Sequence, residues 1–358
     1  MKCQAFFVLL CCQIPTVFAT PLYRATLFDR HLGQPVQTVA YANGSNFFFA
    51  TPTSQRFLAV GSKITNLDTV PGYPRLSLVT QGQRVFAADW DRPNGVREIG
   101  GYYLDGKITK VQPPADYPVG GSWNGWTSYG DWVGGDHYYR ASGGAFGSIG
   151  FAMNPITGEQ VSIQLDYGNR FRGATQKGTL IFGVSADSAM TTDSGVGLLI
   201  RKDGQWRGIG GDFWLWDFNE KERFLYGDRD QLLLMNIDGS RVPFGGNPFG
   251  SLGFQIQSGH LMDNDNVIIR KSDLDGGEYL ISEGTAGFVP LNSRVSGLPT
   301  GGRFTSMTVD RVTQSIYGVY RVGNGPRQSF RLDPVPEPGT LAALGLGIAA
   351  MLRRRRKG

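Results

Sequence analysis

Hydrophobic residues occur in short runs along most of the chain, and the runs are rich in β-branched and aromatic side chains. Examples are residues 47–49, 57–60, 179–182, 232–235 and 267–269. Turn pairs such as Asn94-Gly95, Asp203-Gly204 and Asp238-Gly239 separate the runs, and pairs of this type close β-hairpins. Because no amphipathic helical pattern of convincing length occurs between residues 20 and 333, we expect an all-β body there.

The spacing of the turn pairs suggests how the strands are grouped. Taking one pair per unit, the glycines at 95, 158, 204, 239, 276 and 325 lie about 46 residues apart on average, close to the length of a four-stranded propeller blade. A loose repeat, Val96–Gly101 and Trp206–Gly211, supports this grouping. We therefore expect the body to be a β-propeller of six or seven blades. Tandem β-sandwiches are the alternative.

Two neighbouring segments carry a resemblance. Residues 173–187 contain a turn, an apolar strand and Gly-Val, and residues 197–206 contain an apolar strand followed by Asp-Gly. This order resembles the extracellular HAF-type repeats of secreted propeller-like proteins, although the histidine and alanine that name the repeat are missing. The resemblance implies a propeller and no particular activity.

Residues 1–19 have the layout of a secretory signal peptide. Lys2 precedes an apolar stretch at 5–12, and small residues lead to Ala19, after which we expect cleavage. This predicts export through the Sec machinery. Cys3, Cys11 and Cys12 all lie inside this segment, so the mature body is expected to contain no disulfide and no thiolate nucleophile.

Residues 334–358 form a separate tail of three parts. Pro336, Glu337 and Pro338 precede an apolar segment at 339–352, which is about 21 Å long as a helix at ~1.5 Å per residue. The tail ends with the basic residues Arg353, Arg354, Arg355, Arg356 and Lys357. The segment is short for a permanent membrane span, and the basic cluster favours a cytoplasmic end. We therefore expect a transient membrane insertion that leaves the body outside.

This order of a Pro-Glu-Pro motif, a short apolar segment and an arginine cluster resembles the PEP-CTERM sorting signal of Gram-negative bacteria that make exopolysaccharide. The resemblance implies processing near Pro336–Pro338 by an exosortase-type protease. It also implies a destination in the cell envelope, at the outer surface or in the extracellular matrix. An ordinary tail anchor that is never processed is the alternative.

The net charge of +5 belongs to the two ends. Lys2 and the five basic tail residues account for six of the 35 basic residues, which leaves 29 against 30 acidic residues in residues 20–338. The body is thus nearly neutral, with a net charge of −1, and nucleic-acid binding is not expected.

The sequence offers no clear catalytic constellation. A Gly-x-Ser-x-Gly motif does not occur, and His31, His137 and His260 have no partners at metal-ligand spacing. We expect a non-catalytic body with no catalytic residue and no cofactor. The alternative is a glycan hydrolase or lyase, which would need paired carboxylates in one cleft.

Calcium is the one metal that the sequence suggests. Asp263, Asp265, Asp273 and Asp275 concentrate oxygen ligands in two turns. Neither turn follows the twelve-residue calcium loop, and Asp, Asn and Gly also suit hairpin turns for conformational reasons. Both interpretations stay open.

Aromatic residues are concentrated at 123–140, with rings at about every third position. The candidate residues are Trp123, Trp126, Tyr129, Trp132, Asp136 and Tyr138. A spacing of three fits neither one strand face nor an ordinary helix, so we expect a glycine-rich loop with several rings pointing outward, able to stack on exopolysaccharide. The alternative is that these rings fill the space between sheets.

Overall fold

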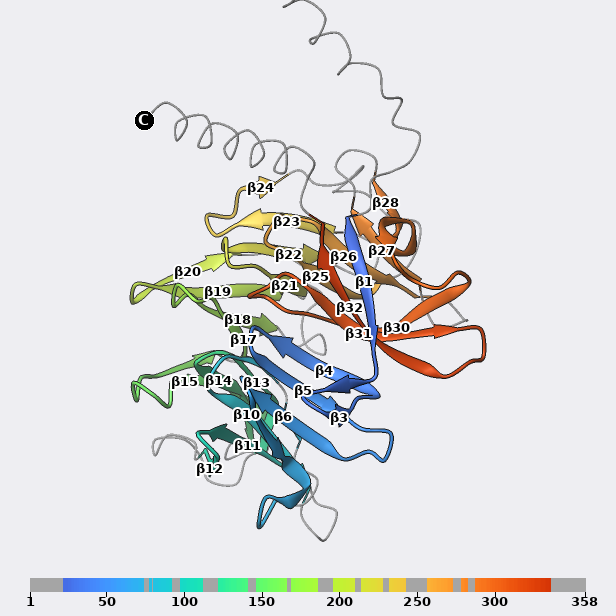
Figure 1. The fold of residues 1–358 in the computed structure, drawn as a ribbon. Helices are drawn as coiled ribbons and strands as arrows, with labels where there is room; N and C mark the ends of the chain where they lie inside the picture. Colours follow the sequence, from blue (N-terminus) through green and yellow to red (C-terminus); the bar gives the residue numbers. More distant parts are fainter. Residues whose placement is uncertain are drawn as a thin grey trace, which may run out of the picture.

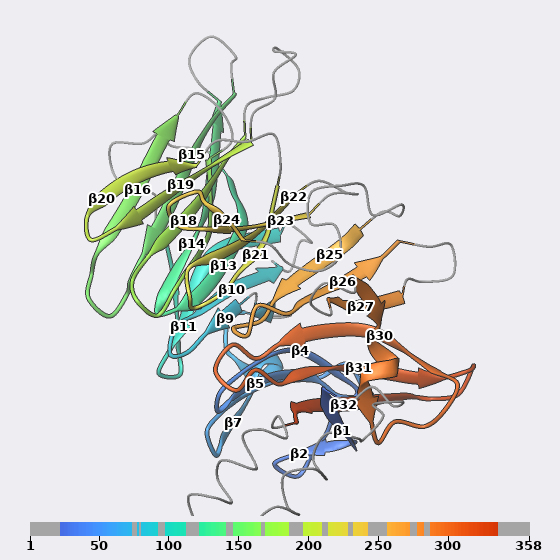
Figure 2. The same ribbon diagram turned by 90° about the horizontal axis from the view of Figure 1, so that it is seen from above.

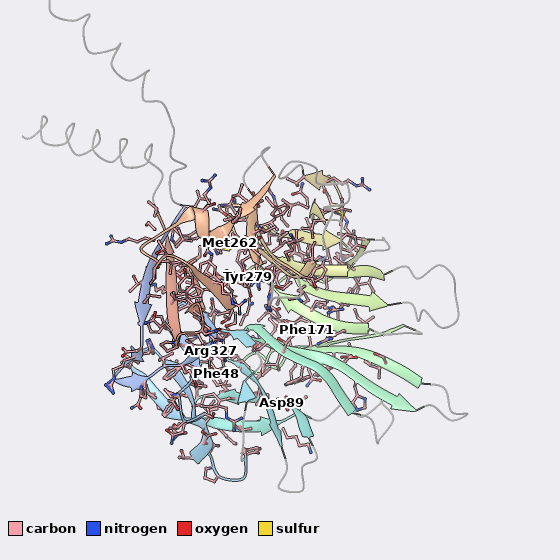
Figure 3. All side chains as sticks on the ribbon, turned by 90° about the vertical axis from the view of Figure 1, so that its right-hand side faces the viewer. Phe48, Asp89, Phe171, Met262, Tyr279 and Arg327 are labelled. Atoms are coloured by element: carbon pink, nitrogen blue, oxygen red, sulfur yellow. The ribbon has the colours of Figure 1, made fainter. Side chains whose placement is uncertain are left out.

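The computed structural model describes residues 22–73, 77–78, 80–91, 97–111, 122–140, 146–165, 169–185, 196–209, 214–227, 232–242, 256–272, 278–282 and 287–335. The strands in these residues form seven sheets of four or five strands, arranged around a central axis (Figure 3). The protein is a seven-bladed β-propeller, as the strand spacing predicted. The alternative interpretation, tandem β-sandwiches, was wrong.

Each blade is an antiparallel sheet whose strands follow one another from the axis to the rim. Blade 1 consists of β4 (Thr38–Asn43), β5 (Asn46–Ala50), β6 (Arg56–Val60) and β7 (Lys63–Asn66). Blade 2 consists of β8 (Ser77–Leu78), β10 (Phe86–Asp91), β11 (Arg97–Leu104) and β12 (Lys107–Lys110). Blade 3 consists of β13 (Ser122–Gly130), β14 (Trp132–Arg140), β15 (Phe146–Met153) and β16 (Gln160–Leu165), and β9 (Thr80–Gly82) adds a parallel strand to β13.

The next three blades follow the same order. Blade 4 consists of β17 (Asn169–Ala174), β18 (Leu180–Ser185), β19 (Val196–Lys202) and β20 (Gln205–Ile209). Blade 5 consists of β21 (Trp214–Phe218), β22 (Arg223–Gly227), β23 (Leu232–Asn236) and β24 (Arg241–Val242). Blade 6 consists of β25 (Ile256–Leu261), β26 (Val267–Lys271), β27 (Glu278–Ser282) and β28 (Phe288–Pro290).

Blade 7 is built from both ends of the body, and this closes the ring. Its inner strands are β30 (Gly302–Val309), β31 (Ile316–Val322) and β32 (Arg327–Pro334), and its fourth strand is β1 (Tyr23–Phe28). β1 lies beside β32 (Figure 1), with Tyr23 opposite Pro334 and Phe28 opposite Ser329. The short strand β29 (Val295–Ser296) pairs in parallel with the start of β1. The hairpin of β2 (Arg30–His31) and β3 (Gln34–Pro35) leads on to blade 1.

The hydrophobic core is divided into seven clusters, each lying between two neighbouring blades. Phe48 packs toward blade 2, whereas Phe47 and Phe49 pack toward Tyr317 of blade 7. Each blade therefore buries both of its faces. This explains why the strands read as continuous apolar runs rather than as an alternation of apolar and polar residues.

Two expectations about local structure were wrong. The repeat Val96–Gly101 and Trp206–Gly211 does not mark equivalent positions, because Arg97 begins the third strand of blade 2 and Trp206 lies on the outermost strand of blade 4. The aromatic segment at 123–140 is not a loop: it forms the long hairpin of β13 and β14, with a β-bulge between Asn124 and Thr127. The rings lie on both faces of this hairpin, because Trp126 packs toward blade 2 and Trp132 packs toward blade 4, so their spacing fits no single face.

Within the residues that the structure describes, no helix is long and apolar enough to cross a membrane. The described helical segments are the short 3₁₀ helices η1 (Leu67–Thr69) and η3 (Leu291–Arg294). The apolar tail segment at 339–352 lies outside the described residues.

Candidate functional site

The axis of the propeller is surrounded by tight turns that join the innermost strand of each blade to the second strand. We call these the inner turns. In blades 4, 5 and 6 they have one backbone pattern, in which the residue before the turn donates its N–H to the carbonyl four positions later, as Asn219 does to Arg223 at 3.0 Å. Glu222 and Asp265 have positive φ angles of 61° and 67°. This is the geometry of a three-residue hairpin loop ending in a left-handed residue.

Hydrogen bonds connect the inner turns of blades 4 to 7. The carboxylate of Glu220 in blade 5 accepts from the N–H of Gln176 in blade 4 at 2.7 Å, and Glu220 N–H donates to Asp263 in blade 6 at 3.0 Å. The amide of Gln314 in blade 7 accepts from Asp263 N–H at 2.7 Å and donates to its carboxylate at 3.2 Å. These bonds hold adjacent blades at their inner ends.

The connections continue from blade 7 to blade 3. Asp310 accepts from the N–H of Gly44 in blade 1 at 3.0 Å. Asn43 Nδ2 donates to the carbonyl of Gln81 at 2.9 Å, and Gln83 N–H donates to the carbonyl of Gly130 in blade 3 at 2.9 Å. The polar turn residues therefore tie consecutive blades together.

Arg311, in the inner turn of blade 7, reaches across the axis. It is 8% exposed, and its guanidinium donates to Gln81, to the carbonyl of Phe218 and to the carboxylate of Asp217. It also lies 4.4 Å from the ring centre of Phe218 and 5.6 Å from that of Tyr129 in blade 3. One side chain thus joins blades 7, 3 and 5 through charge-assisted hydrogen bonds and cation–π contacts.

Burial changes the pKa values of the titratable groups around Arg311, upward for some groups and downward for others. Burial lowers the pKa of His260 on β25 and raises the pKa of Tyr129, so both side chains favour their neutral forms. Burial also raises the pKa of Glu220. For Arg311, burial acts most strongly and would lower the pKa, but the charges of Asp217, Tyr129 and Glu220 and the hydrogen bond to Asp217 together raise it.

Most polar groups described at the axis are engaged with one another. Asp217 accepts from Arg311 and from Leu261 N–H, the latter at 2.8 Å, while Glu220 accepts from Gln176. This arrangement holds the blades together, and the ion pair of Arg311 with Asp217 is part of it. The carboxylates of Asp217 and Glu220 are therefore used in contacts that stabilise the fold.

The predicted glycan-binding residues do not form an exposed surface where the structure describes their side chains. Trp126 is 3% exposed; its Nε1 donates to the carbonyl of Gly101 at 2.6 Å, and its ring is stacked on Phe151. Trp132 and Asp136 are also buried, and Tyr129 faces Phe218 at 5.3 Å. Burial between blades prevents Trp126 and Trp132 from stacking on a ligand in solution, so the prediction of outward-pointing rings was wrong for them. The side chains of Trp123 and Tyr138 lie outside the described part of the structure.

The predicted calcium ligands that the structure describes, Asp263 and Asp265, are engaged with different protein groups. Asp263 accepts from two protein donors, as described above, and Asp265 forms ion pairs with Arg223 and Lys221, the latter at 3.8 Å. Among the described residues, no group of three or more His, Cys, Asp or Glu side chains could hold a metal ion. Asp273 and Asp275 lie outside those residues.

The sorting residues Pro336, Glu337 and Pro338 and the basic residues Arg353–Lys357 also lie outside the described residues, but the point where they join the body is defined. The N–H of Val335 donates to the carbonyl of Leu22 at 2.9 Å. The first two residues of the predicted tail, Pro334 and Val335, are therefore attached to blade 7 beside the start of β1, and the sorting residues follow them in the chain.

Sequence reasoning missed Arg311 and the exposed Trp206. The segment around Arg311 reads as an ordinary polar turn, and its partners Asp217 and Phe218 are more than 90 residues away. No local signal could have identified that contact. Trp206 lies beside the turn pair Asp203-Gly204, where an exposed position could have been recognised.

Comparison with known proteins identifies the tail and supports the fold. Residues 334–357 match the PEP-CTERM protein-sorting motif. The motif marks an exported protein that an exosortase processes. No curated protein matches the chain.

Solved structures of propellers resemble the body. The β-propeller domain of the trilobed protease from Pyrococcus furiosus, described as having an open velcro topology, has a TM-score of 0.52 at 10% identity, covering 83% of this chain and 96% of that one. Acylaminoacyl peptidase from Pyrococcus horikoshii has a TM-score of 0.50 at 10% identity, covering 88% and 55%. A prolyl endopeptidase has a TM-score of 0.54 at 15% identity, covering 88% and 47%. The chain spans about half the length of these two peptidases, and at such identities the likeness shows the fold alone.

Proposed function

We propose that this chain is an exported, non-catalytic protein of the cell surface or extracellular matrix, whose propeller is a binding body for exopolysaccharide. The observation that carries the proposal is the meeting of the two ends at blade 7. Tyr23 pairs with Pro334, and Val335 donates to Leu22, so residues 22–335 contain the whole ring closure. Removal of a signal peptide before Thr20 and of a tail after Val335 would leave the ring complete.

In this proposal the two ends of the chain direct export and sorting, and the propeller binds the ligand. Residues 1–19 direct export through the Sec machinery, and the apolar segment at 339–352 inserts transiently in the membrane until an exosortase cleaves near Pro336–Pro338. A folded body that needs neither end can be released or re-anchored without refolding. This suits a component that is stored in a matrix.

Trp206 supports a glycan ligand better than the aromatic residues of blade 3. It is 44% exposed on the outermost strand of blade 4. Arg201 is directly opposite on β19, so the two side chains share a face, and Arg201 donates to Glu159 of blade 3 at 2.8 Å. Gly208, two residues further on the same face, adds no side chain beside the indole ring. An aromatic face next to a donor and an acceptor is able to hold a sugar ring and its hydroxyls.

Mass spectrometry of the protein recovered from envelope and matrix fractions of the native host tests the export part. We expect an N-terminus near Thr20 and a C-terminus near Pro336–Pro338. An intact arginine tail in the inner membrane would favour the plain anchor and remove the support for a matrix location.

Binding of exopolysaccharide from the native host tests the ligand. We expect Trp206→Ala to weaken binding at least tenfold, because the indole supplies the stacking surface. Val60→Ala, which truncates an apolar side chain of similar exposure (39%) on blade 1, should bind as the wild type does. Equal affinity of the wild type and Trp206→Ala would rule out this contact.

The alternative is a glycan hydrolase or lyase, and one observation favours it. Burial raises the pKa of Glu220, and Asp217 is held beside Arg311, so two acids near the axis differ in their surroundings. Release of reducing ends or unsaturated products by the wild type, lost in Glu220→Gln, would replace the non-catalytic proposal. Asp263→Asn, in the neighbouring inner turn, is the control for loss of structure.

A further inference from the structure

The innermost strand of blade 4 carries an arginine beside the axis. Arg170 is the second residue of β17, and its side chain is 43% exposed. Blades 3 and 4 lie side by side (Figure 2), and the guanidinium of Arg170 lies against Gly125 of β13, the innermost strand of blade 3. A charged group that solvent reaches is therefore held between two inner strands and not at the rim of the ring.

The backbone of β13 is shaped to accept this guanidinium. Gly125 lies in the β-bulge between Asn124 and Thr127 and has a positive φ of 57°, a conformation that favours glycine. A Cβ atom on Gly125 would overlap Nε, Cζ and Nη2 of Arg170. Bulges are frequent next to active sites, where they change the direction of a side chain. Any other residue at this position would therefore have to displace the guanidinium.

Arg170 keeps its hydrogen-bond donors available. Asp136 of β14 lies 4.0 Å from Nε, which is an ion-pair distance but too long for a hydrogen bond. Other ion-paired arginines are bonded directly, as Arg201 is to Glu159 at 2.8 Å. Among the residues that the structure describes, none accepts a hydrogen bond from Arg170. Because Nε is the atom nearest to Asp136, the paired N–H groups of Nη1 and Nη2 form the edge remote from that carboxylate.

The position of Arg170 along the axis indicates where a ligand comes from. Ala174, four residues further along β17, precedes the inner turn of blade 4, so Arg170 is about 13 Å from that turn at ~3.3 Å per residue. The tail leaves at the inner-turn end, because Ser315 of the inner turn of blade 7 donates to Asp333 at 2.7 Å, one residue before Pro334. When the tail is inserted in the membrane, Arg170 lies toward the remote end of the axis. This favours a ligand from outside over lipid headgroups.

We propose that Arg170 binds a carboxylate of an acidic polysaccharide at the axis, an inference that rests on the proposed function and specifies its ligand class. A guanidinium only donates hydrogen bonds and a carboxylate only accepts them, so two parallel N–H groups match its two oxygens. Gly125 and Asp136 orient the guanidinium before the ligand arrives, which lowers the cost of binding. A uronate unit of the polymer supplies such a carboxylate. Trp206, on the outermost strand of the same blade, is a separate contact.

The test compares the binding of polygalacturonate and of its methyl-esterified form by protein purified after expression of the full chain. The ester has the same sugar backbone without the charged carboxylates. We expect the wild type to bind polygalacturonate and Arg170→Gln to bind it about tenfold more weakly, a difference of about 1.4 kcal/mol. Arg170→Lys should recover only part of the affinity, because an ammonium group has no paired donors. Arg331→Gln is the matched control: this arginine is 45% exposed and ion-paired with Asp333, and its variant should bind as the wild type does.

Chemical labelling tests the contact without a variant. Phenylglyoxal modifies accessible guanidinium groups, and peptide mapping by mass spectrometry locates the modified arginines. Polygalacturonate should slow the modification of Arg170 in the wild type and leave that of Arg331 unchanged. Full labelling of Arg170 in the presence of bound polymer would contradict the proposal.

The other arms separate the possible ligands. Unchanged binding by Arg170→Gln would overturn the inference, as would an equal loss in Arg331→Gln. Equal binding of the methyl ester would exclude the carboxylate, and equal binding of poly-L-glutamate would exclude a saccharide. Binding that depends on Arg170 but occurs only with phosphatidylglycerol vesicles would assign the arginine to a membrane.

Failure of this inference can be told apart from failure of the proposed function. Binding of native exopolysaccharide that depends on Trp206, with no binding of polygalacturonate through Arg170, would remove the axial site and leave the proposed function standing. No binding to any polysaccharide would remove both.

Discussion

The guanidinium of Arg311, on the inner turn of blade 7, forms a buried ion pair with the carboxylate of Asp217 on the inner strand of blade 5. The two residues are 94 positions apart in the chain, and the pair crosses the axis of the ring. Because Asp217 also accepts from Leu261 N–H of blade 6, this contact joins three blades that share no strand pairing across the axis.

Loss of one partner of this pair should destabilise the protein strongly. We expect Arg311→Met to lower the free energy of unfolding by about 3–5 kcal/mol, because it leaves the Asp217 carboxylate buried without its cation. Urea unfolding monitored by tryptophan fluorescence measures this. The double variant Arg311→Met, Asp217→Leu should recover most of the loss, and a double variant as unstable as the single one would show that the charge pair is not the cause.

Stability should fall in mildly acidic solution because of His260. Burial lowers the pKa of His260 below its ordinary value of 6.5, so the unfolded chain binds a proton more readily than the folded one. The contribution of the neutral His260 to the free energy of unfolding should therefore be complete above about pH 6.5. It should decrease as the pH falls toward the pKa of the folded state. His31, whose pKa burial also lowers, should contribute in the same direction.

Unfolding measured between about pH 7.5 and 5 checks this. His260→Gln should show a smaller pH dependence than the wild type, and His31→Asn is the companion variant that separates the second histidine. Glu220, whose pKa burial raises, acts in the opposite direction, so variants are compared at each pH. Identical pH profiles for the wild type and His260→Gln would contradict the prediction.

The two tryptophans Trp126 and Trp206 should differ in their effect on stability. Trp126→Ala removes a buried ring stacked on Phe151 and a hydrogen bond to Gly101, and we expect a loss of about 3–5 kcal/mol. Trp206→Ala should cost less, about 1–2 kcal/mol, because the side chain is 44% exposed and its ring contacts Phe182 at 5.8 Å between ring centres. Thermal unfolding of both variants decides this, and a stable Trp126→Ala protein would mean that the ring is not part of the core.

The fold class was predictable from the sequence because the apolar runs follow directly from the propeller geometry. Leu232 and Leu234 pack toward blade 6, whereas Leu233 and Met235 pack toward blade 4. A strand buried on both faces must be apolar at every position, and the turn pairs then mark its ends. The uneven spacing arose because the pairs occupy different turns: Gly158 and Gly204 lie between third and fourth strands, and Gly325 lies between second and third strands.

The sites were less predictable, for reasons that lie in the tertiary structure. The ring spacing around Trp126 suggested exposure because the rings fit no single strand face, whereas both faces of this hairpin are buried against neighbouring blades. Arg311 and Asp217 meet only after the blades have assembled. The sequence around either residue therefore does not indicate the contact.

Calcium should have no effect on the stability of the inner turns. Asp263 accepts from Glu220 N–H and Gln314 Nε2, and Asp265 is paired with Arg223, so their oxygens are used within the protein. We expect the same Tm in EDTA and in millimolar calcium. Asp265→Asn should cost about 1 kcal/mol through loss of a partly exposed ion pair. A rise in Tm with calcium that disappears in Asp265→Asn would restore the metal site.

The ring should depend on the first strand of the body and not on the tail. Deletion of residues 22–28 removes β1, all of which pairs with β32 and which buries Tyr23 against blade 6. The outer edge of β32 would then have no strand to pair with. We expect this variant to unfold at a lower temperature and with lower cooperativity. Deletion of residues 336–358 should leave the Tm unchanged, because β1 and β32 stay paired and the bond from Val335 to Leu22, the last one in the described part of the chain, is kept. Differential scanning calorimetry of both variants separates the two cases. A lower Tm after removal of the tail would mean that processing weakens the body, and the proposal of a released propeller would then lose its structural basis.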